Sequence, residues 1–141
     1  MDKWLMRWQE LKGKHPKALL YTISSLLPMT IMLVVWFFMG SYPFGNKSLM
    51  AVDFGQQYIS FFGLLKHAVL TGDLSSLTYS FTKSLGGDMI GVLVYYLMSP
   101  FNIFYIIIPF KHYGLAVFLT IWLRYGAIGL SFSHFLIKRY K

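Results

Sequence analysis

The stretch ALLYTISSLLPMTIMLVVWFFMG, residues 18–40, contains no charged side chain over its 23 positions. At a helical rise of ~1.5 Å per residue, a run of this length crosses a hydrocarbon core of ~30 Å, so it predicts a transmembrane helix. Pro28 lies inside the run and predicts a kink. A secretory signal peptide has a shorter apolar region and a small-residue cleavage site, so we expect residues 18–40 to be retained as a membrane anchor.

A second apolar run, residues 113–137, is interrupted by Arg124 and His134. Its length suits a tilted spanning helix. Most of the basic residues lie next to these two runs, in the segments 1–17 and 138–141. Because Lys and Arg are enriched on the cytoplasmic side of membranes, we expect both chain ends in the cytoplasm and residues 41–112 outside it. The sequence thus predicts an all-α, multi-pass membrane protein with two transmembrane helices joined by a long outer loop.

The composition excludes several classes of protein. Hydrophobic residues make up 56% of the chain and charged residues 13%, which is unlike a small soluble domain. The net charge of +8 would suit nucleic acid, but the basic residues gather where anionic lipid attracts them, so the lipid bilayer and not nucleic acid is the expected partner. Cysteine is absent, which excludes disulfides and thiolate chemistry. No cofactor or metal site is predicted, and the need for a divalent metal stays open.

A third segment, Met89–Phe110, also lacks charge and competes as a membrane crossing. Pro100 and Asn102 break it in the middle, and Pro109 ends it. A third crossing would also place the basic tail outside the cytoplasm, against the positive-inside tendency. We therefore predict two short helices that lie at the interface or dip into it, and two crossings in total.

The loop between the two spans contains a helical pattern that begins at Phe54 and ends at Gly72. Its apolar face consists of Phe54, Tyr58, Phe61, Phe62, Leu65 and Val69, and its polar face of Gln56, Gln57, Ser60 and Lys66. This pattern predicts an amphipathic helix in the headgroup region. Residues 73–87 are rich in Ser, Thr and Gly and predict an irregular loop, after which Asp88 is expected to cap a helix running to about Met98.

The carboxylates of this loop are Asp53, Asp73 and Asp88, and each lies where a turn or a helix start is expected. Asp53 and Gln56 have the spacing of a capping box, so one hypothesis gives Asp53 a structural role. The alternative is a general base, since a carboxylate held among aromatic side chains loses hydration and binds a proton more tightly. Asp73 is interpreted as a turn residue, and Asp88 as a cap or as a second polar group of the same site.

Arg124 lies near the middle of the second predicted span, where a charge costs about 2.5–3.5 kcal/mol. The reach to either interface is long for snorkelling. Gly126, Gly129 and Ser133 fall on one face of the same helix, a pattern typical of close helix packing. Because the first span offers no carboxylate, the partner of Arg124 is expected on a helix of another subunit or of a longer parent protein.

Several short motifs follow one another along the chain. They are Tyr42-Pro43-Phe44-Gly45, then Asp53 with Gln57-Tyr58, Gly86-Gly87-Asp88, and Tyr95-Tyr96-Leu97-Met98-Ser99-Pro100-Phe101-Asn102. In these motifs, and in their order, the sequence resembles the YfhO-like bacterial membrane proteins, which belong among the multi-span glycosyltransferases of the GT-C class. The resemblance covers about residues 18–138.

The resemblance implies an enzyme that transfers a sugar from a polyprenyl-phosphate carrier to a cell-envelope acceptor such as lipoteichoic acid, outside the bacterial cytoplasmic membrane. GT-C enzymes are similar in placing an essential acidic residue early in the first outer loop, and the residue at this place is Asp53. It would draw the proton from the acceptor hydroxyl. Asp88 would assist by hydrogen bonding, and Arg124, Gln57 and Tyr58 would contact the substrate or the lipid phosphate.

YfhO-like proteins have many more than two spans, so the chain is expected to be the N-terminal portion of a GT-C-like fold. Alone it is expected to be inactive, because two helices cannot enclose a lipid-linked sugar, and further membrane helices are expected as partners. The alternative is a small non-enzymatic subunit that docks a larger membrane protein through Arg124 and the small face of the second span. A transporter component ranks last, because the spans offer little polar path apart from Arg124.

Overall fold

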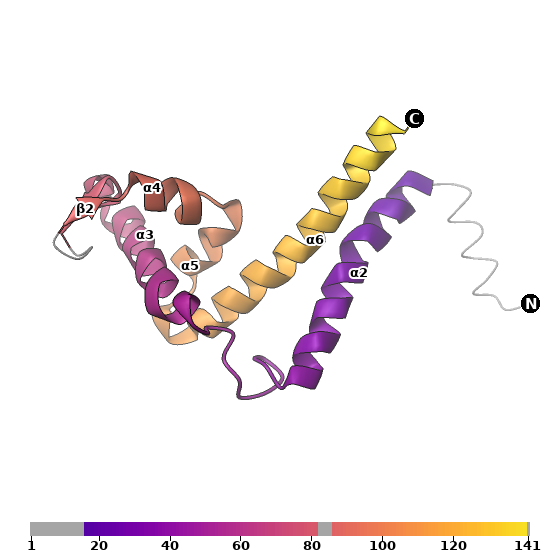
Figure 1. The fold of residues 1–141 in the computed structure, drawn as a ribbon, viewed down its shortest axis with the longest axis horizontal. Helices are drawn as coiled ribbons and strands as arrows, with labels where there is room; N and C mark the ends of the chain where they lie inside the picture. Colours follow the sequence, from indigo (N-terminus) through magenta and orange to yellow (C-terminus); the bar gives the residue numbers. More distant parts are fainter. Residues whose placement is uncertain (1–15, 82–85, 141) are drawn as a thin grey trace, which may run out of the picture. The chain divides into compact units, whose positions relative to one another are not determined.

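The computed structural model describes residues 16–81 and 86–140, which fold mainly into helices (Figure 1). Two of these helices are long and apolar enough to cross a membrane, α2 (Pro16–Met39) and α6 (Tyr113–Arg139). They confirm the predicted all-α membrane fold with two spanning helices. Their bounds lie within two residues of the predicted 18–40 and 113–137. The predicted basic segment 1–17 lies outside the described residues up to position 15.

The chain forms two structural units, each of which is described by itself. In the first unit, here called the helix pair, α2 runs antiparallel to the part of α6 that begins at Ile121 (Figure 1). The indole Nε1 of Trp122 donates a hydrogen bond to the carbonyl oxygen of Met29 at 3.2 Å. Closer to the N-terminal end of α2, the hydroxyl of Tyr21 lies 3.0 Å from Nδ1 of His134, and the two rings stack.

Pro28 lies inside α2, at the contact between these helices. Proline has no N–H, so it withdraws the helical hydrogen-bond donor of the carbonyl four residues earlier, which here belongs to Ser24. Gly129 of α6 faces that carbonyl so closely that a Cβ atom at position 129 would overlap the oxygen. About one turn away, a Cβ atom on Gly126 would collide with the side chain of Met29. The predicted small-residue face of α6 is therefore confirmed, and α2 of the same chain occupies it.

The second unit, here called the central unit, comprises Met39–Thr120 and includes the start of α6. Its elements in chain order are the π-helical segment η1 (Phe54–Tyr58), α3 (Ile59–Thr71), the 3₁₀ segment η2 (Leu74–Leu77), the antiparallel strands β1 (Tyr79–Ser80) and β2 (Gly87–Asp88), α4 (Ile90–Val92), the π-helical segment η3 (Leu93–Leu97), the 3₁₀ segment η4 (Pro100–Asn102), α5 (Ile103–Ile107) and the 3₁₀ segment η5 (Phe110–His112). Gly72 ends α3 with a φ of 76°, as predicted.

A row of aromatic rings forms the core of the central unit. In its middle, the buried rings of Phe62 and Tyr105 stack with centroids 3.8 Å apart and join α3 to α5. Tyr105 also contacts Tyr113 at the start of α6, and Tyr113 stacks on Phe110. On the other side, Phe62 contacts Phe54 of η1. Aromatic pairs contribute about 0.5–1.5 kcal/mol each beyond their buried area, so this row holds five elements together, namely η1, α3, α5, η5 and the start of α6.

The segments Ile90–Leu97 and Pro100–Ile107 meet at a bend of 89° and are here called the elbow. The elbow lies where the sequence predicts two short helices broken at Pro100 and Asn102, and the break is confirmed. Asn102 is buried, and its side-chain amide donates hydrogen bonds to the carbonyl oxygens of Tyr96 at 2.7 Å and Leu97 at 3.0 Å. The amide therefore satisfies the carbonyls at the end of the first arm, where the helix stops providing donors.

Two predictions for the central unit are wrong in detail. Lys66 is half-buried and not on a polar face, because its Nζ donates to the carbonyl of Ile108 at 2.7 Å and lies 5.7 Å from the ring centroid of Phe110. Residues 73–87 are not simply irregular, since η2, β1 and the start of β2 lie there, while positions 82–85 are outside the described residues.

Candidate functional site

Asp53 lies directly before η1 and directly after a backbone outlier. Val52 has a φ of 52°, in the left-handed region, which costs about 1–2 kcal/mol for an L-residue and is rare for a β-branched one. The Asp53 side chain is exposed and accepts no hydrogen bond from the residues that the structure describes. The capping-box hypothesis for Asp53 and Gln56 is therefore wrong. Backbone strain of this kind concentrates at functional sites, which favours the second hypothesis for Asp53.

Tyr58, which lies within electrostatic reach of this carboxylate, contacts a tyrosine from another element. The hydroxyl of Tyr58 in η1 donates a hydrogen bond to Tyr96 in η3, and the two rings meet edge to face with centroids 4.5 Å apart. This hydrogen bond is the main reason why the pKa of Tyr58 is raised to about 12, and desolvation and the electrostatic effects of Tyr96, Tyr95 and Asp53 add to it. Tyr58 thus stays protonated at neutral pH and remains a hydrogen-bond donor to Tyr96, within electrostatic reach of Asp53.

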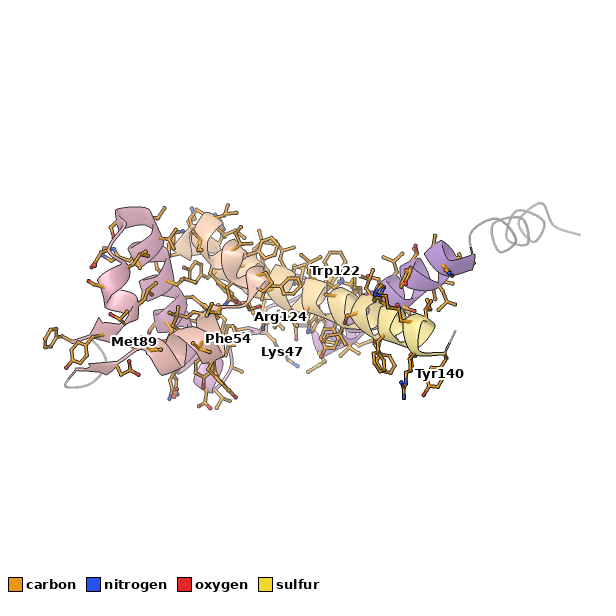
Figure 2. All side chains as sticks on the ribbon, turned by 90° about the horizontal axis from the view of Figure 1, so that it is seen from above. Lys47, Phe54, Met89, Trp122, Arg124 and Tyr140 are labelled. Carbon is orange, nitrogen blue, oxygen red and sulfur yellow. The ribbon has the colours of Figure 1, made fainter. Side chains whose placement is uncertain are left out.

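Both tyrosines belong to π-helical turns, which are rare in proteins and frequent at functional sites. Phe54, labelled in Figure 2, stacks on Tyr58 with centroids 5.6 Å apart, and Phe61 stacks on Tyr96 at 6.1 Å. Four rings from η1, α3 and η3 therefore hold one another in place. Their packing positions the turn that carries Asp53.

The other acidic and polar residues of the central unit that the sequence analysis considered are exposed or accept hydrogen bonds from residues close to them in the sequence. Gln57 is exposed on η1. Oδ1 of Asp88 accepts a hydrogen bond from the backbone N–H of Ile90 at 3.1 Å. Asp88 thus satisfies a donor at the start of α4, as a cap would, although the N-cap residue itself is Met89. Asp73 accepts from the backbone N–H of Ser75 at 3.2 Å and also from its hydroxyl, so its interpretation as a turn residue is confirmed. Among the predicted site residues of the central unit, Tyr58 therefore lies within electrostatic reach of Asp53. Asp73 and Asp88 instead accept hydrogen bonds at the starts of helical turns.

Arg124 lies on α6 in the helix pair, two positions after Trp122 and therefore about 200° around the helix from it (Figure 2). Trp122 faces α2 through its hydrogen bond to Met29, so Arg124 leaves α6 in another direction. Arg124 is half-buried and takes part in an interaction within the chain. Its charge therefore does not by itself require a helix from another chain, as the sequence had suggested.

The small face of α6 is not available for docking a larger protein in this structure. Gly126 and Gly129 contact α2, and Ser133 is buried with its hydroxyl donating to the carbonyl of Leu130 at 2.8 Å. A partner helix would have to displace α2 to reach this face. The idea of a non-enzymatic subunit that docks through these residues therefore loses the surface on which it was based.

The chemistry that the described residues offer is that of acids and hydrogen-bond donors. Across residues 16–81 and 86–140, no three side chains of His, Asp or Glu gather in a way that could hold a metal ion. What the central unit presents is an exposed carboxylate on a strained turn, beside a phenol that stays protonated.

The family model described as "Bacterial membrane protein YfhO" matches residues 24–141, a stretch that contains the Asp53 turn, the elbow and α6. The chain belongs to the YfhO family. No curated protein and no solved structure matches it.

The structure gives a physical reason for one motif of this YfhO-family chain, Tyr42-Pro43-Phe44-Gly45. The motif forms a closed turn after α2, in which the N–H of Tyr42 donates to the carbonyl of Lys47 at 2.9 Å. The N–H of Lys47 donates in turn to the carbonyl of Gly40 at 3.1 Å. A Cβ atom at Gly45 would overlap that same Gly40 carbonyl, so the turn needs glycine there.

Two residues of the candidate site were not predicted. Tyr96 lies in a motif that the sequence analysis singled out, but helical periodicity cannot show that it reaches Tyr58, because the two come from separate elements. Val52 gave no signal at all, since Val is a residue that normally avoids positive φ. The only hint in the sequence was the density of aromatic residues around both motifs.

Proposed function

We propose that this YfhO-family chain is the N-terminal part of a membrane glycosyltransferase of the GT-C class. The enzyme would move a sugar from a polyprenyl-phosphate carrier to a hydroxyl of a cell-envelope acceptor such as lipoteichoic acid. In this proposal residues 1–17 and 138–141 lie in the cytoplasm, and residues 41–112 lie at the outer face of the bacterial cytoplasmic membrane. The observation that supports it best is the exposed Asp53 carboxylate, which follows a strained residue and lies beside a packed aromatic cluster.

Asp53 acts as the general base in this reaction. Its carboxylate takes the proton of the acceptor hydroxyl while that oxygen forms a bond to the anomeric carbon of the sugar. The bond from this carbon to the phosphate oxygen breaks at the same time, and the polyprenyl phosphate leaves. A carboxylate that capped its own helix would be a weaker base, because hydrogen bonds to the charged form stabilise it. The lack of a cap bond from Asp53 to η1 therefore suits this role.

Four further residues bind and orient the substrate in this proposal. Tyr58 keeps its proton far above neutral pH and donates it to Tyr96, so its phenol does not compete with Asp53 for the reacting proton, and its oxygen can accept a hydrogen bond from a sugar hydroxyl. Gln57, exposed on the same turn, offers an amide for sugar hydroxyls. Asp88 assists by hydrogen bonding, and Arg124 meets the lipid phosphate as a charge-assisted donor. The remaining walls of such a site come from further membrane helices.

The test uses membranes that contain the natural gene product with its partners, and it measures sugar transfer from a polyprenyl-phosphate-linked donor. Asp53→Asn should lower the rate of transfer by roughly 10²–10⁴-fold, the usual contribution of a positioned base, without changing membrane insertion. Asp73→Asn is the matched control, because an Asn side chain can still accept the N–H of Ser75. Transfer at the normal rate by Asp53→Asn would overturn the assignment.

A further inference from the structure

The elbow has a proline at its bend, and this proline changes the hydrogen bonding of the backbone. In an α-helix each N–H bonds to the carbonyl four residues earlier, and proline has no N–H. Pro100 therefore leaves the carbonyl of Tyr96 without its α-helical donor. The side-chain amide of Asn102 donates to this carbonyl at 2.7 Å and to that of Leu97 at 3.0 Å. A buried side chain thus replaces the missing backbone donors at the bend.

The second arm of the elbow ends in the same way. Pro109 removes the α-helical donor of the Tyr105 carbonyl, and the phenol of Tyr113 donates to that carbonyl at 3.0 Å. The carbonyl of Ile108, just past the end of α5, accepts from Nζ of Lys66 at 2.7 Å. The protein therefore supplies donors to carbonyls that helix ends normally leave to water. These are the carbonyls of Tyr96 and Leu97 at the bend and those of Tyr105 and Ile108 at the end of the second arm.

The outer surface of the elbow is apolar on both arms. Its large exposed side chains, with exposed fractions of 52–79%, are Ile90, Val94, Tyr95, Met98, Ile103 and Ile107. Residues 89–110 contain no charged side chain. A surface of this kind is unfavourable in water but not in hydrocarbon. Hydrocarbon, however, offers no hydrogen-bond donor to a carbonyl that the protein leaves unpaired.

We propose that the elbow is embedded in the bilayer, with the exposed side chains of both arms against lipid acyl chains. The 89° bend lets the chain enter the hydrocarbon and return without crossing it. The internal capping of its carbonyls suits a solvent that offers no hydrogen bonds, and the uncharged surface suits the same solvent. This inference concerns the elbow alone and does not depend on glycosyl transfer.

The chain has no cysteine, so a single introduced cysteine carries a single fluorescent label. The full chain, with Val94→Cys or Ile103→Cys, is labelled with an environment-sensitive nitrobenzoxadiazole dye and reconstituted into phosphatidylcholine vesicles. The control is Leu74→Cys in η2, since Leu74 is 60% exposed and Val94 is 62% exposed. Emission is then compared between vesicles of ordinary lipid and vesicles of lipid brominated in the acyl chains.

We expect the labels on Val94→Cys and Ile103→Cys to lose most of their emission in brominated lipid, and the label on Leu74→Cys to keep its emission. Labels on the elbow that are unaffected by bromine but react with an aqueous quencher would show that the elbow lies in water and would overturn the proposal. Labels shielded from both quenchers would show that protein covers the elbow, which would overturn it as well. If one of these variants is not recovered, Met98→Cys, at a site 68% exposed, gives the same readout.

Discussion

The carbonyl oxygen of Ser24 faces Gly129 so closely that position 129 has no room for a side chain. Pro28 contributes to this contact, because it removes the helical donor that would otherwise bond the Ser24 carbonyl. The neighbouring atoms at Gly129 are backbone atoms and the ring of Pro28, none of which can swing away as a flexible side chain does. The approach of α2 to α6 is therefore fixed at this point by three residues.

Gly129→Ala should lower the free energy of unfolding by about 1–3 kcal/mol, because the added methyl group forces the two helices apart. The measurement is thermal unfolding of the purified chain in detergent micelles. Gly114→Ala is the matched control on the same helix, since a Cβ atom there would lie 3.8 Å from the ring of Tyr42, an ordinary contact. Equal stability of the two variants would mean that α2 and α6 do not pack as described.

The two spanning helices could be predicted from the sequence because their signal is local. Residues 18–40 carry no charge, and a helix of that length is the simplest way to satisfy backbone groups in lipid. The break at Pro100 could be predicted for the same reason, because proline lacks the backbone N–H that a helix needs at its own position. What these local signals could not give is the partner of each side chain.

Lys66 shows why the rest could not be predicted. Its spacing from Gln56, Gln57 and Ser60 placed it on a polar face, but Ile108, forty-two positions away in the sequence, presents a carbonyl that needs a donor. Asp53 shows that spacing was also insufficient at the candidate site. Its spacing from Gln56 matches the capping-box pattern, yet Val52 turns the backbone and the Asp53 carboxylate makes no cap. Both outcomes depend on tertiary packing, which a single sequence does not display.

Asn102→Leu should destabilise the chain in lipid vesicles by about 1–3 kcal/mol for each carbonyl left without a donor, namely those of Tyr96 and Leu97. Leucine is close to asparagine in size, so little packing is lost. The free energy of unfolding is measured in vesicles and again in short-chain detergent, where water can reach the bend and the loss should shrink. Asn46→Leu, at an exposed turn position, is the control and should change little. The same loss for both variants would show that the amide of Asn102 has no special role.

Val52→Gly separates stability from function at the Asp53 turn. Glycine adopts a φ of 52° without strain, so the substitution removes a cost of about 1–2 kcal/mol and adds an entropic cost of about 0.5–1 kcal/mol. Val52 is 77% exposed, so little packing is lost. We expect a small gain in stability together with slower sugar transfer, because the turn that aims Asp53 becomes looser. Ala51→Gly, one residue earlier, carries only the entropic cost, so a Val52→Gly variant as unstable as Ala51→Gly would contradict the role of strain.

Tyr58 should ionise far above the ordinary pKa of 10.0, at about 12, since ionisation breaks its hydrogen bond to Tyr96. The folded chain then holds this proton more tightly than the unfolded chain does. The resulting stabilisation is fully present below pH 10 and is lost as the pH rises towards 12. The measurement is an alkaline titration of the protein with tyrosine labelled at Cζ, followed by nuclear magnetic resonance, with Tyr58→Phe to assign the signal.

Two further variants test the cause of the raised pKa of Tyr58. Tyr96→Phe removes the largest cause and should move the titration of Tyr58 back towards 10.0. Tyr140→Phe, at a site 80% exposed, is the control and should leave the titration of Tyr58 in place. A Tyr58 signal that titrates near 10.0 in the unaltered chain would mean that η1 and η3 do not meet through these two phenols, and the positioning of Asp53 by that contact would fall with it.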